Sequence, residues 1–186
     1  MSRKLLAFAI AVTTALLAQC QVLEPLQQHI PGHYVYTHSW DYNAPDGLGT
    51  IHCDEEGVLW FYADGTFADT AVQHHRLTVT DTTAGGSVQP RTLLLDFHYQ
   101  CPGAWRVDNG KFLFSEHSEG FDMQLLDGSA DAWTQSLADK IENQTRPVST
   151  RWFTFDIERL DSEWFIWSYT YKTGRKDTWE MRRSKD

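Results

Sequence analysis

The feature that most constrains this chain is a succession of short extended segments, each followed by residues that form tight turns. Residues 33–40 alternate, with aromatic or histidine side chains on one face, which is the period of a β-strand. Asp64-Gly65 and Asn109-Gly110 lie between apolar runs, and such pairs supply the positive φ angles that tight hairpins need. Strands joined by tight turns pair antiparallel, so the sequence predicts an antiparallel sheet.

The alternation continues along most of the chain. Further strands are expected at residues 58–62, 67–72, 75–80, 91–99, 104–107, 111–114, 121–126, 152–159, 164–172 and 177–183. Residues 82–87, rich in Thr, Gly and Ser, are expected to form a flexible loop. About eight to ten strands at short, regular spacing favour a mainly β fold, a barrel or a sandwich.

One segment has a helical period instead. Residues 131–143 carry an apolar stripe at a spacing of four, made of Trp133, Leu137 and Ile141. Either Ser129 or Asp131 could cap this helix. Two interpretations stay open: a helix that covers one end of the barrel, and a mobile lid over a ligand cavity.

The N-terminus has the order of charge and apolar residues that is typical of export. Arg3 and Lys4 precede an apolar run from Leu5 to Ala18, which is too short to span a bilayer comfortably. Residues 1–19 are therefore predicted to be a signal peptide, with a buried N-terminal helix as the alternative. Residues 31–186 are predicted to form one domain after processing.

Residues 16–20, Leu-Leu-Ala-Gln-Cys, resemble the lipobox of bacterial lipoproteins. The resemblance implies that Cys20 carries a lipid and that residues 20–30 are a tether. Gln19 departs from the small residue of that pattern, and ordinary cleavage after Ala18 is the competing interpretation. The expected location is the bacterial cell envelope, anchored to a membrane leaflet at the outer membrane or cell surface, or otherwise the periplasm.

Cysteine arithmetic agrees with export. If Cys20 is lipidated, Cys53 and Cys101 remain as an even pair, and an oxidising compartment permits a disulfide between them. Two free buried thiols are the alternative.

Charge and motifs exclude several classes of function. The formal net charge of −9 repels phosphate backbones, so no nucleic-acid partner is expected. Residues 54–56, Asp-Glu-Glu, are interpreted as a solvated loop before a strand, and the adjacent His74 and His75 as pointing to opposite faces of a strand. The sequence contains no nucleophile elbow, phosphate-binding loop or zinc-ligand spacing. We therefore expect no enzyme activity, no metal and no cofactor.

Four segments together resemble a known family. They are Gly32-His33-Tyr34, the hairpin at residues 60–67, the hairpin at residues 103–112, and residues 155–183 with their basic end. In this order they are similar to lipocalin-like (calycin-like) domains of small bacterial envelope lipoproteins. The resemblance covers about residues 30–183 and implies an eight-stranded antiparallel barrel whose interior holds one small apolar ligand.

Aromatic side chains in the expected strands are the candidates for lining such a cavity. They are Tyr34, Tyr36, Trp40, Trp60, Trp105 and Trp167. Filling the core is the plainer role for the same side chains. The leading hypothesis is an envelope lipoprotein that binds a small apolar ligand, and the alternative is a non-catalytic module that binds an envelope protein.

Overall fold

The computed structural model describes residues 25–185 except 83–87, 127, 129, 149 and 150. The predicted signal peptide, Cys20 and all but the first residue of the loop expected at 82–87 lie outside the described residues. Part of the expected tether has structure, because η1 (Pro25–Gln28) is a turn of 3-10 helix.

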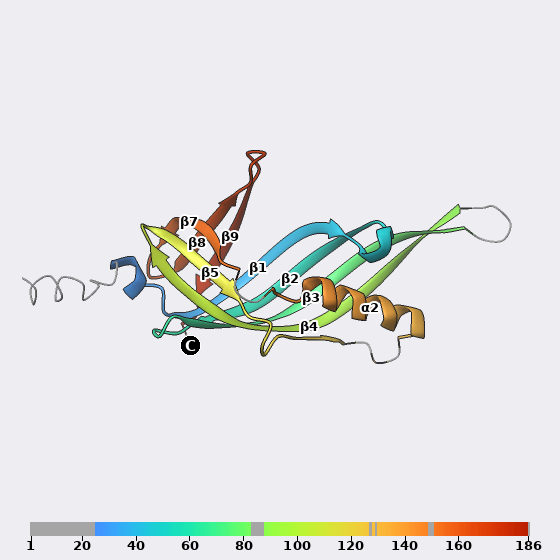
Figure 1. Cartoon of the computed structure of the whole chain (residues 1–186), viewed down its shortest axis with the longest axis horizontal. Helices are drawn as coiled ribbons and strands as arrows, with labels where there is room; N and C mark the ends of the chain where they lie inside the picture. The colour runs from blue at the N-terminus through green and yellow to red at the C-terminus, as the bar shows by residue number, and fades with distance from the viewer. Residues whose placement is uncertain (1–24, 83–87, 127, 129, 149–150, 186) are drawn as a thin grey trace, which may run out of the picture.

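Eight antiparallel strands close into a barrel, which confirms the mainly β prediction (Figure 1). The strands of the sheet are β1 (Gly32–Asn43), β2 (Thr50–Phe61), β3 (Thr66–Thr82), β4 (Val88–Asp108), β5 (Lys111–Glu116), β6 (Asp122–Leu125), β7 (Phe153–Leu160), β8 (Trp164–Thr170) and β9 (Lys176–Arg183). Their order is β3-β2-β1-β9-β8-β7-β5-β4, and pairing of β3 with β4 closes the ring. The short β6 pairs only with β4 and lies beside the ring.

Two pairs of expected strands turn out to be single long strands. Residues 67–72 and 75–80 both belong to β3, and residues 91–99 and 104–107 both belong to β4. The β3–β4 ladder runs without a break, so the residues between the expected segments stay paired. These strands continue with β1 and β2 well beyond the barrel proper, as a curved half-cylinder (Figure 1).

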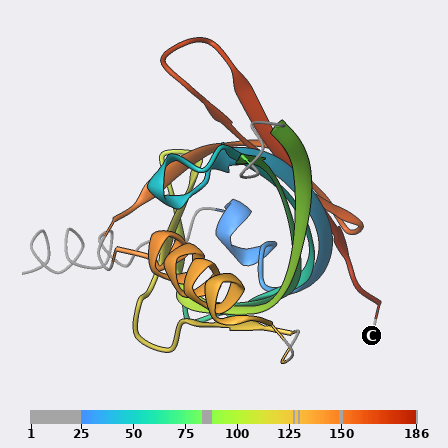
Figure 2. The same ribbon diagram turned by 90° about the vertical axis from the view of Figure 1, so that its right-hand side faces the viewer.

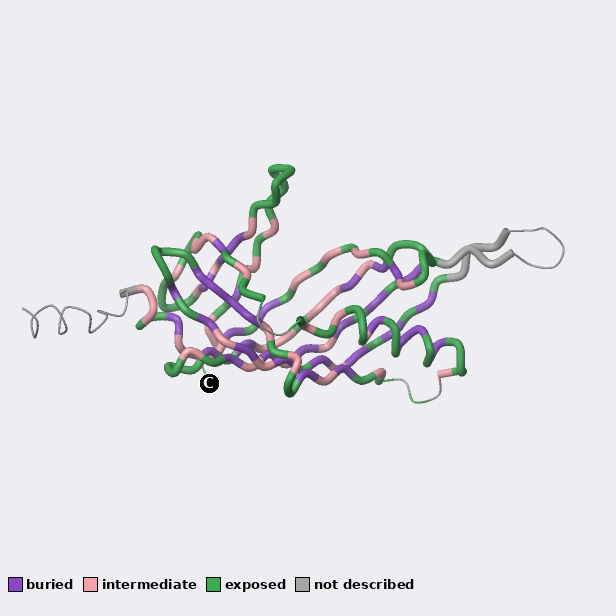
Figure 3. The backbone as a smooth tube through the Cα atoms, in the orientation of Figure 1, coloured by how far each residue is buried: buried purple, intermediate pink, exposed green. Residues whose placement is uncertain are grey.

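An aromatic core fills the end of the barrel near the N-terminus. Phe61 lies at its centre, with ring centroids 5.8–5.9 Å from those of Trp105, Phe112 and Phe165. Leu26 packs against this core, and Figures 1 and 2 show its helix, η1, at this end of the barrel. Figure 3 shows buried segments on the strands of this end, and residues 112–115 of β5 are buried without interruption.

The helix α2 (Ala132–Thr145) has nearly the bounds that the sequence predicts. Of the two candidate caps, Asp131 accepts a hydrogen bond from the Thr134 N–H at 2.7 Å. Leu137 and Ile141 are buried as expected, whereas Trp133 is exposed.

Figure 2 looks along the barrel and shows α2 across its open end, near η2 (Pro45–Gly47). Lys140 pairs with Asp46 of η2, and the Gln144 side chain donates to the Asn43 carbonyl at 3.0 Å. The helix therefore covers the half-cylinder of long strands. None of the described helices is long and apolar enough to cross a membrane.

Candidate functional site

The barrel contains a cavity of about 480 Å³ above the aromatic core. Its walls are mainly aromatic and include Trp40, Phe114, Phe155, Trp167, Tyr169 and Trp179. These side chains come from β1, β5, β7, β8 and β9, where alternate residues point inward. The volume is within the range of small-molecule sites.

The walls on β1 and β9 are built from stacked rings. His38 stacks on Trp179 at 4.8 Å and on Trp40 at 5.4 Å between ring centroids. Burial lowers the pKa of His38, which keeps its imidazole neutral near pH 7. Phe155 meets Trp179 edge-on at 5.5 Å. This part of the cavity therefore offers flat, uncharged surfaces.

The floor of the cavity is acidic. Glu55 of β2, Asp69 of β3 and Glu116 of β5 all line it. The Tyr36 hydroxyl lies 2.7 Å from Glu55 Oε1 and 2.9 Å from Asp69 Oδ1, and the Tyr99 hydroxyl lies 3.4 Å from Glu116 Oε1. Each of these carboxyl groups therefore receives a hydrogen bond from a tyrosine hydroxyl.

Burial changes the protonation of these carboxyl groups. Desolvation raises the pKa of Glu55 to about 7 and the pKa values of Asp69 and Glu116 above the ordinary range. Repulsion from Glu55 raises the pKa of Asp69 further. The hydrogen bonds from Tyr36 act in the opposite direction and lower the pKa values of both Glu55 and Asp69. The floor therefore carries fewer than three negative charges near neutral pH.

Gly57 makes this arrangement possible. It pairs with Tyr36 on one side and Ala71 on the other, in the middle of the barrel wall. A Cβ atom at Gly57 would lie 2.8 Å from the Tyr36 hydroxyl oxygen and 2.8 Å from the Ala71 Cβ. Because glycine has no side chain, the Tyr36 ring can cross β2 and reach Asp69 on β3.

Polar contacts continue from the floor towards the end of the barrel that α2 covers. Gln73 hydrogen-bonds to Glu55 and lies 3.0 Å from His75 Nε2. The His75 Nδ1 lies 2.6 Å from the Tyr42 hydroxyl. Burial lowers the pKa of His75 to about 4, so this histidine is neutral at physiological pH.

Exposed residues mark the mouth of the cavity. Arg151 lies over the Phe153 ring at 4.6 Å, and Arg175 lies over the Tyr171 ring at 4.8 Å. Arg175 also forms an ion pair with Asp177 at 2.8 Å. The mouth therefore lies between the segment after α2 and the β8–β9 hairpin, which projects from the barrel in Figure 1.

Three of the six aromatic residues expected to line the cavity do so: Tyr36, Trp40 and Trp167. Tyr34 and Trp105 point inward but belong to the filled end of the barrel. The indole N–H of Trp105 donates to the Tyr62 and Thr66 carbonyls and so braces the hairpin between β2 and β3. Trp60 faces outward and is 42% exposed. Alternation in the sequence predicts which face of a strand a side chain is on. It does not predict how far along the barrel axis that side chain lies.

The interpretation of residues 54–56 as a solvated loop is wrong. They lie inside β2, and Glu55 points into the cavity between inward-facing Cys53 and Leu59. The signal was present in the alternation Ile51, Cys53, Glu55, Leu59, because Glu55 has the parity of buried neighbours. Asp69, Gln73 and Glu116 were likewise missed.

The expected disulfide does not form in this structure, where Cys53 and Cys101 are buried free thiols. Cys53 pairs with His75 and Cys101 pairs with Asp69, on opposite sides of β3. Six residues of β3 separate those partners, which is about 20 Å along a strand. A disulfide needs Cα atoms within about 7 Å, so the two thiols cannot meet in this barrel.

The histidines of the described residues do not form a cluster that could bind a metal. His74 and His75 point to opposite faces, as predicted: His75 is buried, while His74 is exposed and lies 2.8 Å from Asp96. Within the described residues, no three His, Cys, Asp or Glu side chains are arranged to hold a metal ion.

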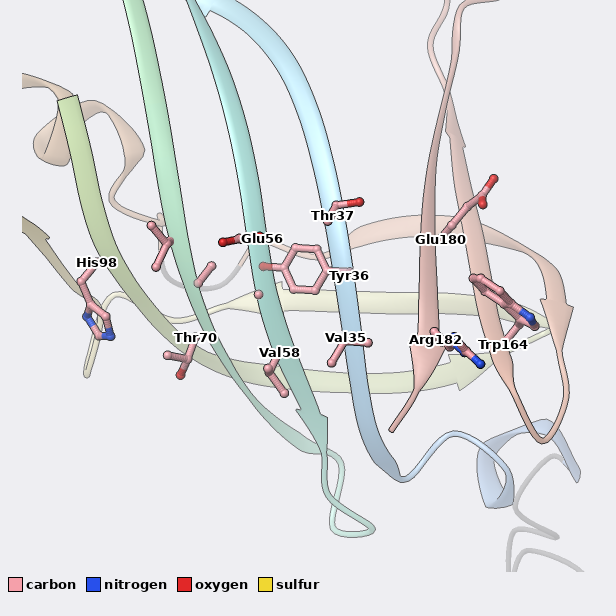
Figure 4. A pocket seen from close by; sticks show the side chains of 13 residues that line it. Val35, Tyr36, Thr37, Glu56, Val58, Thr70, His98, Trp164, Glu180 and Arg182 are labelled. Carbon is pink, nitrogen blue, oxygen red and sulfur yellow. The ribbon is translucent and has the colours of Figure 1, made fainter. Parts of the chain in front are cut away.

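A second hollow lies on the outer wall, where β1, β2 and β3 curve beside the β8–β9 hairpin (Figure 4). Val35, Val58 and Trp164 supply its apolar surface, and Arg182 and Glu180 supply charge. This outer groove is shallow and open to solvent, and Val35 is 44% exposed. The cavity, in contrast, lies between the strands of the barrel and opens only at its mouth.

Comparison of the chain with models of protein families and with curated proteins finds no match. The geometry of the cavity and the chemistry of its lining are therefore the guides to function.

Proposed function

We propose that this protein is a cell-envelope binding protein that takes one small, largely apolar ligand into its lipocalin-like barrel. The observation that carries the proposal is the cavity of about 480 Å³, with aromatic walls, inside an otherwise closed barrel. A barrel filled by its own side chains, as at the end around Phe61, would leave no such space. In this proposal the protein binds its ligand inside the barrel.

The same proposal includes export and anchoring. The basic and apolar N-terminus and the Leu-Leu-Ala-Gln-Cys sequence support a lipid on Cys20, with residues 21–24 joining it to η1. A binding barrel fixed to the envelope would meet its ligand outside the cytoplasm. Mass spectrometry of the membrane fraction tests this part, because a lipidated Cys20 adds the mass of its acyl chains.

Binding itself is tested with the neutral apolar dye N-phenyl-1-naphthylamine and with native mass spectrometry of the purified mature protein. We expect the dye to fluoresce on binding and a co-purified small molecule to be released on denaturation. Trp179→Leu should weaken dye binding about fivefold, since an aromatic contact contributes roughly 1 kcal/mol beyond its buried area. Trp164→Leu on the outer groove is the matched control and should leave binding unchanged.

The outer groove supports a second candidate function, a module that binds an envelope protein. The exposed Val35 and the half-buried Val58 and Trp164 form an apolar surface with charges at its edge, as in protein interfaces. If the dye does not bind and Trp164→Leu abolishes capture of an envelope protein, this function replaces ligand binding.

A further inference from the structure

Among the residues that the structure describes, no cation forms an ion pair with the acidic floor of the cavity. Glu55, Asp69 and Glu116 receive hydrogen bonds from Tyr36, Gln73 and Tyr99, all of which are neutral. The nearest charges in the floor are the other carboxyl groups, which repel one another. Burying carboxylates without a cation costs free energy, so this floor is complementary to a positive charge.

The acidic floor and the aromatic walls belong to one continuous space. Phe114 and Glu116 are alternate residues of β5 and both line the cavity. Tyr36 and His38 are alternate residues of β1 and join the floor to the stack of His38 and Trp179 in the same way. A ligand held by the carboxyl groups would therefore extend its apolar part along the aromatic rings, whose faces also attract cations.

A buried donor gives a second sign that the cavity is incomplete without a ligand. Trp167 lines the cavity and is only 3% exposed. Within the part of the chain that the structure describes, its indole Nε1–H has no hydrogen-bond partner. A buried polar group without a partner calls for an explanation, and an acceptor atom on a ligand would supply one if the indole turned this nitrogen, which has almost no accessible surface, towards the cavity.

Resting on the proposed binding function, we propose that the ligand is a small aromatic amine whose ammonium group binds to Glu55, Asp69 and Glu116. Its ring lies between the aromatic walls, and an oxygen on the ring accepts from the indole of Trp167 once that side chain turns its N–H towards the cavity. The charge of the ligand, more than its apolar area, then distinguishes it from other flat molecules of similar size.

The same geometry makes binding depend on pH, because the ammonium group competes with protons for the floor. Burial raises the pKa of Glu55 to about 7, so the group is largely protonated below that pH. The charged or titratable groups that line the cavity around Glu55 are Tyr36, His38 and Asp41 on β1, Asp69 on β3, Tyr99 on β4, Glu116 on β5, Tyr169 on β8, and Arg151, Tyr171, Arg175 and Asp177 at the mouth. Affinity for an amine should therefore rise between about pH 5.5 and pH 8.

Isothermal titration calorimetry at pH 8 with three matched probes tests the proposal. The probes are tyramine, the neutral 4-(2-hydroxyethyl)phenol and the anionic 3-(4-hydroxyphenyl)propionate. We expect tyramine to bind at least tenfold more tightly than the alcohol and the acid to bind most weakly. At pH 6.5, tyramine binding should release protons, seen as a heat that changes with the ionisation enthalpy of the buffer.

Two variants locate the charge. Glu55→Gln should weaken tyramine binding about tenfold and leave binding of the alcohol within twofold. Glu56→Gln removes the same charge from the neighbouring residue, which faces outward, and should change neither. Circular dichroism and thermal unfolding confirm that each variant is folded.

The outcomes separate this inference from the function on which it rests. Equal affinity for tyramine and the alcohol, or equal effects of the two variants, overturns the amine assignment while dye binding still supports an apolar site. Failure of tyramine, the alcohol and the dye to bind overturns both proposals.

Discussion

Glu55 is a carboxyl group that the fold holds in a poor environment for its charge. Burial raises its pKa from 4.5 to about 7. Between these pH values the folded protein binds more protons than the unfolded chain, so stability falls as pH rises through this window. Glu55→Gln removes the cost of ionising a buried carboxyl group. Its effect on the free energy of unfolding should therefore be more favourable at pH 8 than at pH 4, by on the order of 2 kcal/mol. Urea unfolding at the two pH values measures the difference.

Glu56→Gln is the control for that measurement, because Glu56 is exposed on the outer side of the same strand. A surface substitution of this kind should change stability by less than about 0.5 kcal/mol at either pH. If Glu55→Gln had the same effect at pH 4 and pH 8, the carboxyl group would not be held in a protonated state by burial.

Residue identity explains why the polar floor escaped prediction. A run of three acidic residues ordinarily faces solvent, so the sequence favours a solvated segment here. The alternation along β2, which places Glu55 inward, is a weaker signal than this acidic run. The crossing of Tyr36 over Gly57 depends on strand register, which pairs Tyr36 with Gly57. Register is a relation between distant segments, so no local pattern contains it.

The helix α2 begins at a cap that the sequence already indicates. Asp131 accepts the Thr134 N–H, one of the N–H groups that the first turn leaves without a helical partner. Asp131→Ala should therefore lower the free energy of unfolding by about 1 kcal/mol. Asp131→Asn keeps an acceptor and should cost much less, and chemical denaturation compares the two. Equal losses in both variants would mean that the cap hydrogen bond does not stabilise the helix.

For the individual helices and strands, the sequence predicts the type of each element well and the length of the strands poorly. The bounds of α2 and the hairpin at Asn109-Gly110 follow from local chemistry, and Asn109 has the positive φ of 52° that its turn requires. The long strands β3 and β4 were each divided in two, because polar residues such as Gln73 and Gln100 interrupt the apolar pattern. Long-range pairing keeps those residues in the ladder.

Barrel closure belongs to the whole molecule, and it could be expected only through a family resemblance. The ring needs the pair of its first and last strands, β1 and β9, as well as the β3–β4 pair, and the β1–β9 pair joins Tyr34 to Arg183 and Tyr36 to Met181. The cavity follows from closure, because its walls come from strands on both sides of this seam. The regular spacing of the strands indicates a barrel or a sandwich, but it does not indicate which part of the interior is left unfilled by side chains.

The seam between β1 and β9 is short, and Arg183 reinforces it. Its guanidinium group donates to the Pro31 and His29 carbonyls at 2.9 and 2.6 Å and lies 4.8 Å from the centre of the Tyr34 ring. Lysine cannot reproduce this fork, so Arg183→Lys should destabilise the protein by about 1–3 kcal/mol. Hydrogen exchange should accelerate at β1 and β9 before it does at the long β3–β4 ladder, since opening starts where few pairs hold the ring. Arg182→Lys, on the exposed neighbour, should leave both stability and exchange unchanged, and equal effects of the two substitutions would show that the seam does not depend on Arg183.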